Sequence, residues 1–170
     1  HAMTVSMHAV AVPIFVRILE QLKAILDKAE AHAKAAGYDA AVLLEARLYP
    51  DMWPVRQQVA GATAFGVRGV ARLAGVDVPT LPEALATFAD LHARLDATLA
   101  FVKAADKAAV DAGATRQLTV PWGNEQKSMT GLVYFQVLAL PNFMFHATTT
   151  YDILRHNGVP LEKKDFTGSF

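Results

Sequence analysis

The stretch "PNFMFHATTTYDILRHNG", from Pro141 to Gly158, predicts the second half of a helix that begins near Thr130. Positions at three- and four-residue steps share one face of a helix, and here they are mainly apolar, so this face points toward a core. The face consists of Leu132, Phe135, Ala139, Asn142, His146, Thr149 and Ile153. Asn142 and His146 are four residues apart, so their side chains stack about 6 Å from each other on the inner face. Pro141 removes one backbone hydrogen bond, which predicts a kink beside them.

Two further long helices are expected earlier in the chain. Residues Ser6 to Ala36 carry apolar side chains at the same spacing and predict the first one. The second is expected from Asp51 to about Leu73, before Gly75. The Asp51 carboxylate is the expected N-cap, because it can accept hydrogen bonds from the amides of the first turn. Pro54 would then lie in that turn, where its missing N–H costs little.

Small residues fill the interior of the second long helix. They are Ala60, Gly61, Ala62, Ala64, Gly66, Gly69 and Ala71. Each glycine costs about 1 kcal/mol relative to alanine in a helix interior. The pattern therefore predicts a compensating close approach, either of a neighbouring helix or of a second subunit.

A third helix and a hairpin complete the pattern. The motif "TLPE", Thr80 to Glu83, matches a capping box with proline in the first turn, so the third helix is expected to begin there. Its period fades into a loop near Gly113. The stretch "QLTVPWGNEQKSMTG", residues 117–131, alternates briefly around Gly123-Asn124 and predicts a β-hairpin. Thr130 is the expected cap of the last helix.

These elements predict an all-α fold, a four-helix up-down bundle with a short β-hairpin between the third and fourth long helices. A short additional helix is expected from Asp39 to Ala46. The 170 residues fit one domain, 1–170. His1 and Ala2 are interpreted as a cloning remnant, and residues 159–170 as a C-terminal tail anchored by Phe166.

The composition limits the classes of partner. Lys plus Arg and Asp plus Glu are equal at 16 each, so no broad basic face is expected to bind nucleic acid or an anionic membrane. Cysteine is absent, which excludes disulfides, thiolate metal sites and cysteine nucleophiles, and fits a reducing cytoplasm. The apolar run from Ala9 to Val16 is shorter than the roughly 20 residues that span a bilayer. The sequence therefore predicts a cytoplasmic protein without a membrane segment.

The polar pair on the last helix is the first candidate site. Gln58 of the second helix lies on or beside its inner face, where it could meet His146. One imidazole and two amides are a poor ligand set for a transition metal, yet an adequate one for hydrogen bonding. The alternative is a core histidine that simply satisfies its hydrogen bonds with Asn142 or another helix. Secondary candidates for the wall of a pocket are Asp51, Trp53, Arg56 and Tyr151, although capping, surface pairing and hydrophobic anchoring explain several of them equally well.

The segments "VPIFVRILEQLKAILDKAEAH", "LYPDMWPVRQQV" and "ALPNFMFHATTTYDILRHNGVPLEKKDF" resemble the DinB/YfiT-like four-helix-bundle superfamily, and most closely a bacterial branch of unknown function. The superfamily typically binds a divalent metal through three histidines, one on the second helix and an H-x-x-x-H pair on the last. His146, followed by Leu154-Arg155 and Gly158, matches the second histidine of that pair, and Asn142 takes the place of the first. Gln58 is the best match to the remaining histidine, with Gln57 as a one-residue alternative. The resemblance thus implies a degenerate metal site, or a divalent metal such as Zn or Ni held by other ligands.

Three functions remain open from the sequence. The first is a small-molecule-binding bundle protein with its pocket near Gln58, Asn142 and His146. The second is a metal-dependent transferase or hydrolase, with His146 as a ligand and Asp51 or water replacing the missing histidines. The third is a non-enzymatic homodimer that associates through a helix face such as the small-residue second helix.

Overall fold

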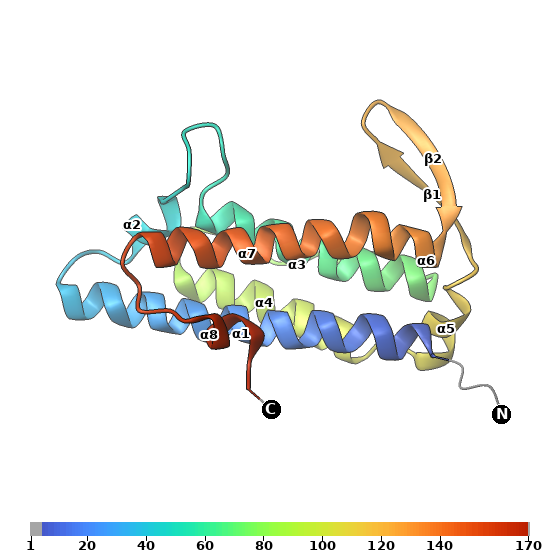
Figure 1. Cartoon of the computed structure of the whole chain (residues 1–170), viewed down its shortest axis with the longest axis horizontal. Helices are drawn as coiled ribbons and strands as arrows, with labels where there is room; N and C mark the ends of the chain where they lie inside the picture. Colours follow the sequence, from blue (N-terminus) through green and yellow to red (C-terminus); the bar gives the residue numbers. More distant parts are fainter. Residues whose placement is uncertain (1–4, 170) are drawn as a thin grey trace.

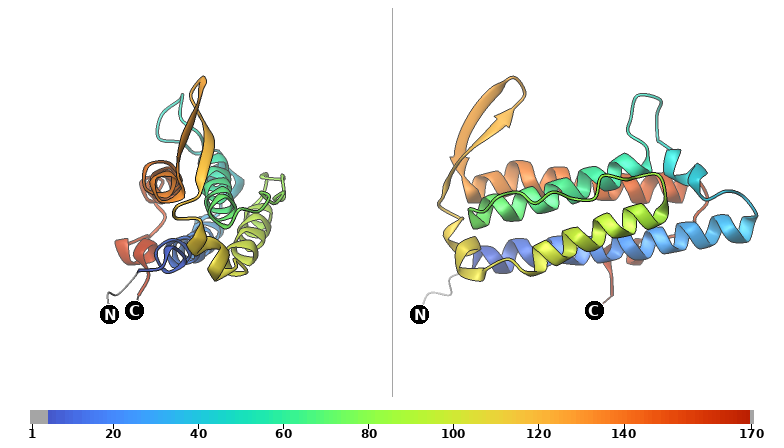
Figure 2. Two further views of the ribbon diagram at one scale, coloured as in Figure 1. Left: turned by 90° about the vertical axis from the view of Figure 1, so that its right-hand side faces the viewer. Right: turned by 180° about the vertical axis from the view of Figure 1, so that it is seen from behind.

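The computed structural model describes residues 5–169 and shows a bundle of four long helical segments (Figures 1 and 2). The segments are α1 (Met7–Ala36), α3 (Val55–Ala74), α4 (Phe88–Lys103) and a last one made of α6 (Gly131–Tyr134), η1 (Phe135–Ala139) and α7 (Leu140–His156). Seen end-on, α7 and α3 form one layer and α1 and α4 the other (Figure 2, left). The predicted helical fold with one hairpin is confirmed. The expected cloning remnant, His1 and Ala2, lies outside the described residues.

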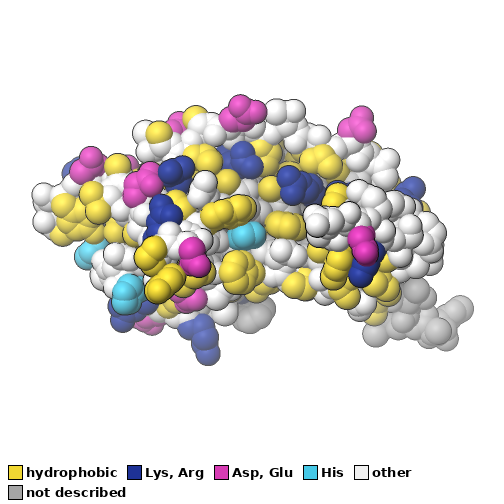
Figure 3. All heavy atoms as spheres, turned by 90° about the horizontal axis from the view of Figure 1, so that it is seen from above, with side chains coloured by type: hydrophobic (Ala, Val, Ile, Leu, Met, Phe, Trp, Pro, Cys, Tyr) yellow, Lys and Arg dark blue, Asp and Glu magenta, His cyan; other side chains and the backbone are white. Residues whose placement is uncertain are grey.

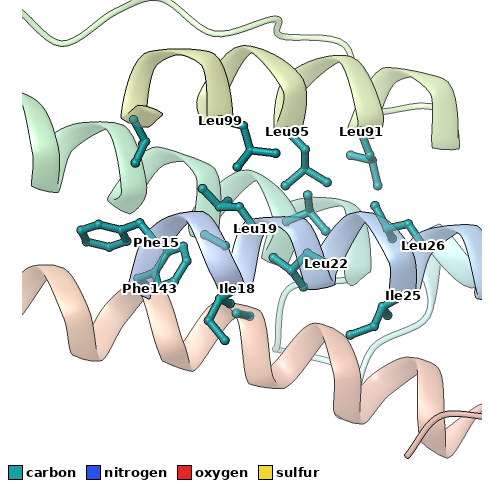
Figure 4. Close-up of a cluster of buried hydrophobic side chains, with 14 of the residues drawn as sticks. Phe15, Ile18, Leu19, Leu22, Ile25, Leu26, Leu91, Leu95, Leu99 and Phe143 are labelled. Atoms are coloured by element: carbon teal, nitrogen blue, oxygen red, sulfur yellow. The ribbon is translucent and has the colours of Figure 1, made fainter. Parts of the chain in front are cut away.

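The core lies between the two layers, where the apolar face of α1 meets α3, α4 and α7 (Figure 4). Fully buried side chains of this core include Phe15, Leu19, Leu22, Ile25, Leu26, Leu91, Leu95 and Phe143. The helix boundaries of α1 agree with the prediction. The Ser6 hydroxyl accepts a hydrogen bond from the Ala9 amide, and Gly37 ends the helix in the left-handed region at φ 77°.

The direction of the helices differs from simple up-down alternation. Thr63 of α3 contacts Arg94 of α4, and Gly66, three residues later, lies against Thr98, four residues later. The residue numbers of the contacting pairs therefore rise together along both helices, which means that α3 and α4 run parallel. A parallel neighbour requires the chain to return along the bundle before the next helix can start. Residues 76–87 form this crossover, which runs beside α3 (Figure 2, right).

The predicted start of the third helix at Thr80–Glu83 is wrong, because this stretch belongs to the crossover. The helix α4 begins at Phe88, where Thr87 accepts a hydrogen bond from the Asp90 amide and the Asp90 carboxylate accepts one from Thr87. "TFAD" is thus the capping box that forms. Pro82 disfavours a helical conformation at the residue before it, which helps to keep the earlier motif extended.

The predicted N-cap of α3 is also wrong. An N-cap directly precedes the first helical residue, and in α3 that position belongs to Pro54, with an extended ψ of 168° and no side-chain hydrogen bond. Asp51 lies in a turn three residues earlier and is exposed. The other end of α3 agrees with the prediction, since Gly75 adopts φ 70°.

The glycines of α3 face the protein's own helices. A Cβ on Gly61 would lie 2.8 Å from the His146 ring of α7, and one on Gly69 would lie 3.0 Å from the Phe15 ring of α1. Gly66, between them, is buried as well. Of the two predicted compensations, close approach of a neighbouring helix is therefore the one found, and these glycines offer no surface to a second subunit.

The hairpin forms where it was predicted, from β1 (Gln117–Trp122) and β2 (Glu125–Thr130), and it projects from one end of the bundle (Figure 1). Gly123 adopts φ 62° in the turn, a conformation that suits glycine. Thr130 caps the last helical segment through a hydrogen bond from the Val133 amide, as predicted.

The irregularity expected beside Pro141 takes the form of a π-helical turn, η1, which ends just before it. Such turns are rare and concentrate at functional sites. Three short helices complete the chain: α2 (Ala41–Glu45), α5 (Lys107–Ala112), where a loop was expected, and α8 (Lys163–Thr167) in the tail. As predicted, Phe166 anchors the tail, with its ring 6.1 Å from that of Tyr151. Within residues 5–169, no helix has both the length and the apolar character to cross a membrane.

Candidate functional site

The centre of the candidate site is His146, which α7 places against α3. Its side chain is 9% exposed, and the edge of the imidazole formed by Cγ, Cδ2 and Nε2 lies over Gly61. Only a residue without a side chain leaves room for this ring, because any Cβ would overlap it. The glycine in mid-helix, which costs helix stability, thus creates the seat of the histidine.

Aromatic rings enclose the imidazole on three sides. Trp53 stacks on one face with centroids 5.5 Å apart and planes at 12°, and Phe65 stacks at 5.8 Å and 24°. Phe145 meets the ring edge-on at 5.4 Å and 80°. Because these rings fix the plane of the imidazole, its two nitrogens point in defined directions.

A chain of two hydrogen bonds determines the tautomer of His146. The Gln58 Nε2 group donates to the Trp53 carbonyl at 3.1 Å, and a carbonyl can only accept, so the amide orientation is fixed. The Gln58 Oε1 atom therefore faces His146 Nδ1 at 2.8 Å and accepts its hydrogen. In the neutral ring this leaves Nε2 without a proton, with its lone pair available.

The environment keeps this histidine neutral. Burial lowers the pKa of His146 below its ordinary value, because desolvation penalises the charged ring. Nε2 makes no hydrogen bond within the described chain, and it is not sealed from solvent. The site thus presents one oriented hydrogen-bond acceptor inside an aromatic surround.

Two cavities adjoin this cluster, and Trp53 lines both of them. The smaller, of about 180 Å³, is lined by Met52, Trp53, Gln58, Phe145 and His146. The larger, of about 290 Å³, follows the outer face of α3 and is lined by Trp53, Gln57, Ala60, Gly61, Ala64, Phe65, Arg68 and Leu85. Figure 3 views the face of the bundle formed by α3 and α7, where hydrophobic side chains, Lys or Arg and a histidine gather. Both linings are mainly apolar with few polar groups, which is typical of small-molecule sites.

The donors present do not fit a metal centre. Among residues 5–169, no group of three or more His, Asp or Glu side chains lies close enough to hold a metal ion. The Gln58 oxygen already accepts from His146, and the Asn142 amide donates to the Leu138 carbonyl at 2.8 Å. His146 Nε2 is the imidazole nitrogen that remains, whereas zinc sites in proteins use three or four nitrogen, sulfur or carboxylate ligands.

The chemistry available is therefore acceptance of a hydrogen bond or of a proton at Nε2. No carboxylate, hydroxyl or amine is among the residues that line the two cavities. A nucleophile of the serine, lysine or carboxylate type is therefore not among the residues that line these cavities.

Of the residues predicted for the site, Gln58, Trp53 and His146 are brought together. The other four candidates lie outside the cluster. Arg56 pairs with Glu45 at 2.6 Å, and Asp51 is exposed and lines neither cavity.

Asn142 and Tyr151 are the remaining two. The Asn142 amide is half-buried and satisfies the Leu138 carbonyl at the π-helical turn, so it does not bond His146 although both lie on α7. Tyr151 packs against Phe166 in the tail. Neither side chain lines one of the two cavities.

Sequence reasoning missed Gly61, Phe65, Phe145 and Arg68 as parts of the site. A signal existed for two of them: Gly61 and Phe65 lie three and seven residues after Gln58, on the same face of α3. Phe145 and Arg68 are exposed, and their spacing carries no inward signal. Only the packing of α3 against α7 shows what they adjoin.

Comparisons with known proteins agree with this fold. A family model described as a domain of unknown function, DUF1993, matches residues 7–167. The crystal structure of a DinB family member protein from Shewanella denitrificans is 37% identical, covers 96% of this chain and 92% of its own, and superimposes with a TM-score of 0.89. No curated protein matches the chain. The chain therefore belongs to the DUF1993 family of DinB-like helical-bundle proteins.

Proposed function

We propose that this protein binds a small, largely apolar organic molecule in the cavities beside His146. The observation that carries the proposal is the neutral imidazole, held by Gln58 and by stacked rings with Nε2 unprotonated. Nε2 has no hydrogen-bond partner within the described chain and is open to solvent, so an incoming molecule can reach it and donate to it. A bound molecule with an O–H or N–H group would supply the missing hydrogen bond.

The aromatic surround favours a planar ligand. Trp53 borders both cavities and is 51% exposed, an unusual position for a side chain of this size. A ring stacked on its free surface would bury apolar area that now faces water. The ligand class that fits is a flat molecule with a hydrogen-bond donor at its edge.

The proposal is tested with phenol and toluene, which share a ring and differ in one hydroxyl group. Trp122→Phe leaves Trp53 as the sole tryptophan, since the chain contains two. We expect phenol to change the Trp53 fluorescence at about fivefold lower concentration than toluene, because a net hydrogen bond contributes about 1 kcal/mol. His146→Phe, which keeps a ring but loses the acceptor, should abolish that preference. Absence of any response of Trp53 to either probe would refute the proposal.

A second candidate function is self-association into a homodimer. Residues 131–151 of the last segment contain no charged residue, and Val133, Val137 and Phe145 of this segment are 40%, 47% and 55% exposed. Two copies of an uncharged face can meet without opposing like charges, and a two-fold dimer brings the same face together twice. A second copy is therefore the occupant that this face suits.

Light scattering tests the dimer. We expect a dimer mass for the natural chain and a monomer mass for Val137→Lys, because the new charge would be buried at the interface. The control is Ala100→Lys, at an exposed position of α4 in the other layer of the bundle, and this variant should remain dimeric. A monomer mass for the unmodified protein would exclude this candidate.

A further inference from the structure

The charge of α3 is unbalanced, although the whole chain is neutral. Residues 55–74 include Arg56, Arg68 and Arg72 and not one Asp or Glu. Positive charge is thus concentrated on the helix that forms one wall of the larger cavity. Such concentration matters only where the charges are not neutralised by neighbours from other elements.

Two of these arginines have partners and one does not. Arg56 pairs with Glu45, and Arg72 donates to the Tyr134 hydroxyl at 3.2 Å. The guanidinium of Arg68 has neither a hydrogen bond nor an ion pair with any described residue. The guanidinium lies over the Phe65 ring, whose centroid is 5.9 Å from Cζ.

The surroundings of Arg68 increase its positive potential. Burial, and then the charge of Arg68, lower the pKa of Arg94 on α4, and Glu83 offsets part of this effect. The Arg94 guanidinium is engaged by Thr63 at 2.7 Å and by the Pro82 carbonyl at 2.7 Å. Arg94 is thus held in place, and its fixed charge lies close enough to act on the free guanidinium.

The larger cavity joins this free cation to the aromatic cluster. It extends along α3 from Gln57 to Arg68, eleven residues or about 16 Å at the rise of a helix. Between these ends its lining is apolar, formed by Trp53, Ala60, Ala64, Phe65 and Leu85. An elongated molecule would therefore meet apolar surface along its body and a guanidinium at one end.

We infer that the molecule bound at this site is an organic anion, with a planar apolar body against Trp53 and Phe65 and a carboxylate or similar group paired with Arg68. The inference rests on the proposed function and specifies its ligand class. Guanidinium is suited to this role because its planar N–H groups pair with both oxygens of a carboxylate. Arg68 would then determine specificity for charge at the end of the larger cavity, which Trp53 shares with the smaller cavity beside His146.

The test uses three naphthalene probes of one shape on the Trp122→Phe protein: 2-naphthylacetate, 2-naphthylacetamide and 2-(2-naphthyl)ethylamine. We expect the anion to bind about tenfold more tightly than the neutral amide, as a charge-assisted pair would give, and the cation more weakly than both. Arg68→Gln should reduce binding of the anion to the level of the amide and leave the amide unchanged. Added salt should weaken the anion alone.

Arg72→Gln is the matched control. It removes the same charge from the same helix, four residues on, from a side chain that does not line the cavity. The preference for the anion should survive this change. An equal loss of anion binding in both variants would reflect only the overall positive charge of α3 and would overturn the assignment of Arg68. Equal binding of 2-naphthylacetate and 2-naphthylacetamide to the protein with Arg68 intact would overturn it as well.

The failures of the two proposals can be told apart. Binding of the amide without preference for the anion contradicts the anion site and leaves the pocket standing. If no naphthalene probe and neither phenol nor toluene perturbs Trp53, both proposals fall. Thermal melts of Arg68→Gln and Arg72→Gln establish that each variant is folded before its binding is compared.

Discussion

At the scale of single residues, Gly61 explains why a histidine can lie inside the interface of α3 and α7. The ring of His146 fills the space that a Cβ would occupy, with atoms at 2.8 to 2.9 Å. The Gln58 side chain then orients Nδ1, and Trp53 both stacks on the ring and accepts from Gln58. The position of the imidazole is thus determined from several directions at once.

Gly61→Ala is expected to displace His146 and to lower the stability of the fold, even though alanine favours a helix by about 1 kcal/mol. The ring cannot move away without losing its hydrogen bond to Gln58. Gly66→Ala is the control, because the nearest atoms to its Cβ position lie at 3.6 to 3.8 Å, an ordinary contact distance. Chemical denaturation should show a loss for the first variant and a gain of up to about 1 kcal/mol for the second. A gain in both would show that the ring is not seated on Gly61.

The pairing of Gln58 with His146 could be predicted from the sequence because both follow the inward period of their helices. The role of Asn142 could not, although it follows the same period. Its amide bonds the carbonyl four residues earlier at the π-helical turn, and a change of helical period there is not encoded in the apolar pattern. Arg56 is directed to Glu45 of α2, an element whose position depends on tertiary packing.

At the scale of elements, two capping motifs compete for the start of α4. Both "TLPE" and "TFAD" place a threonine three residues before an acidic residue. The second one is used, because α4 runs parallel to α3 and the chain needs residues 76–87 to return along the bundle. Local sequence supplies the candidates, whereas the connection between parallel helices selects one. The boundaries of α1, the hairpin and the last segment involve no such choice, and the sequence predicts them well.

Thr87→Ala should therefore destabilise the protein by about 1 kcal/mol, the usual cost of losing a threonine N-cap. Thr80→Ala removes the same hydroxyl from an exposed position in the crossover and should have almost no effect. Urea denaturation of the two variants compares them directly. The reverse order would mean that the helix begins at the earlier motif.

At the scale of the whole molecule, the stability of the fold should depend on pH through His146. Its pKa is lowered in the folded protein, so the unfolded chain binds more protons as pH falls below the ordinary histidine value of about 6.5. The contribution of the neutral ring is therefore complete above that pH and is lost progressively as pH falls toward the lower folded value. We expect the stability difference between the natural protein and His146→Phe to shrink between about pH 7.5 and pH 5. A difference that stays constant over this range would contradict the lowered pKa.

The bundle as a whole was predictable in its class and in its number of long helices, since these follow from the apolar period. The parallel arrangement of α3 and α4 was not, because the same amphipathic helices can pack in either direction. The site shares this limit. The residues of the site come from α3, α7, the loop before α3 and the crossover. The role inferred for Arg68 depends on the cavity lined by Trp53, α3 and Leu85, which only the folded structure shows.

The most direct measurement is nitrogen-15 NMR of the His146 ring, which distinguishes a protonated from an unprotonated imidazole nitrogen. Near neutral pH, the account predicts a neutral ring with the proton on Nδ1 and an unprotonated Nε2, and a titration midpoint below the ordinary histidine value. Gln58→Leu should release this tautomer preference. A ring that carries its proton on Nε2, or that is charged near pH 7, would contradict the account.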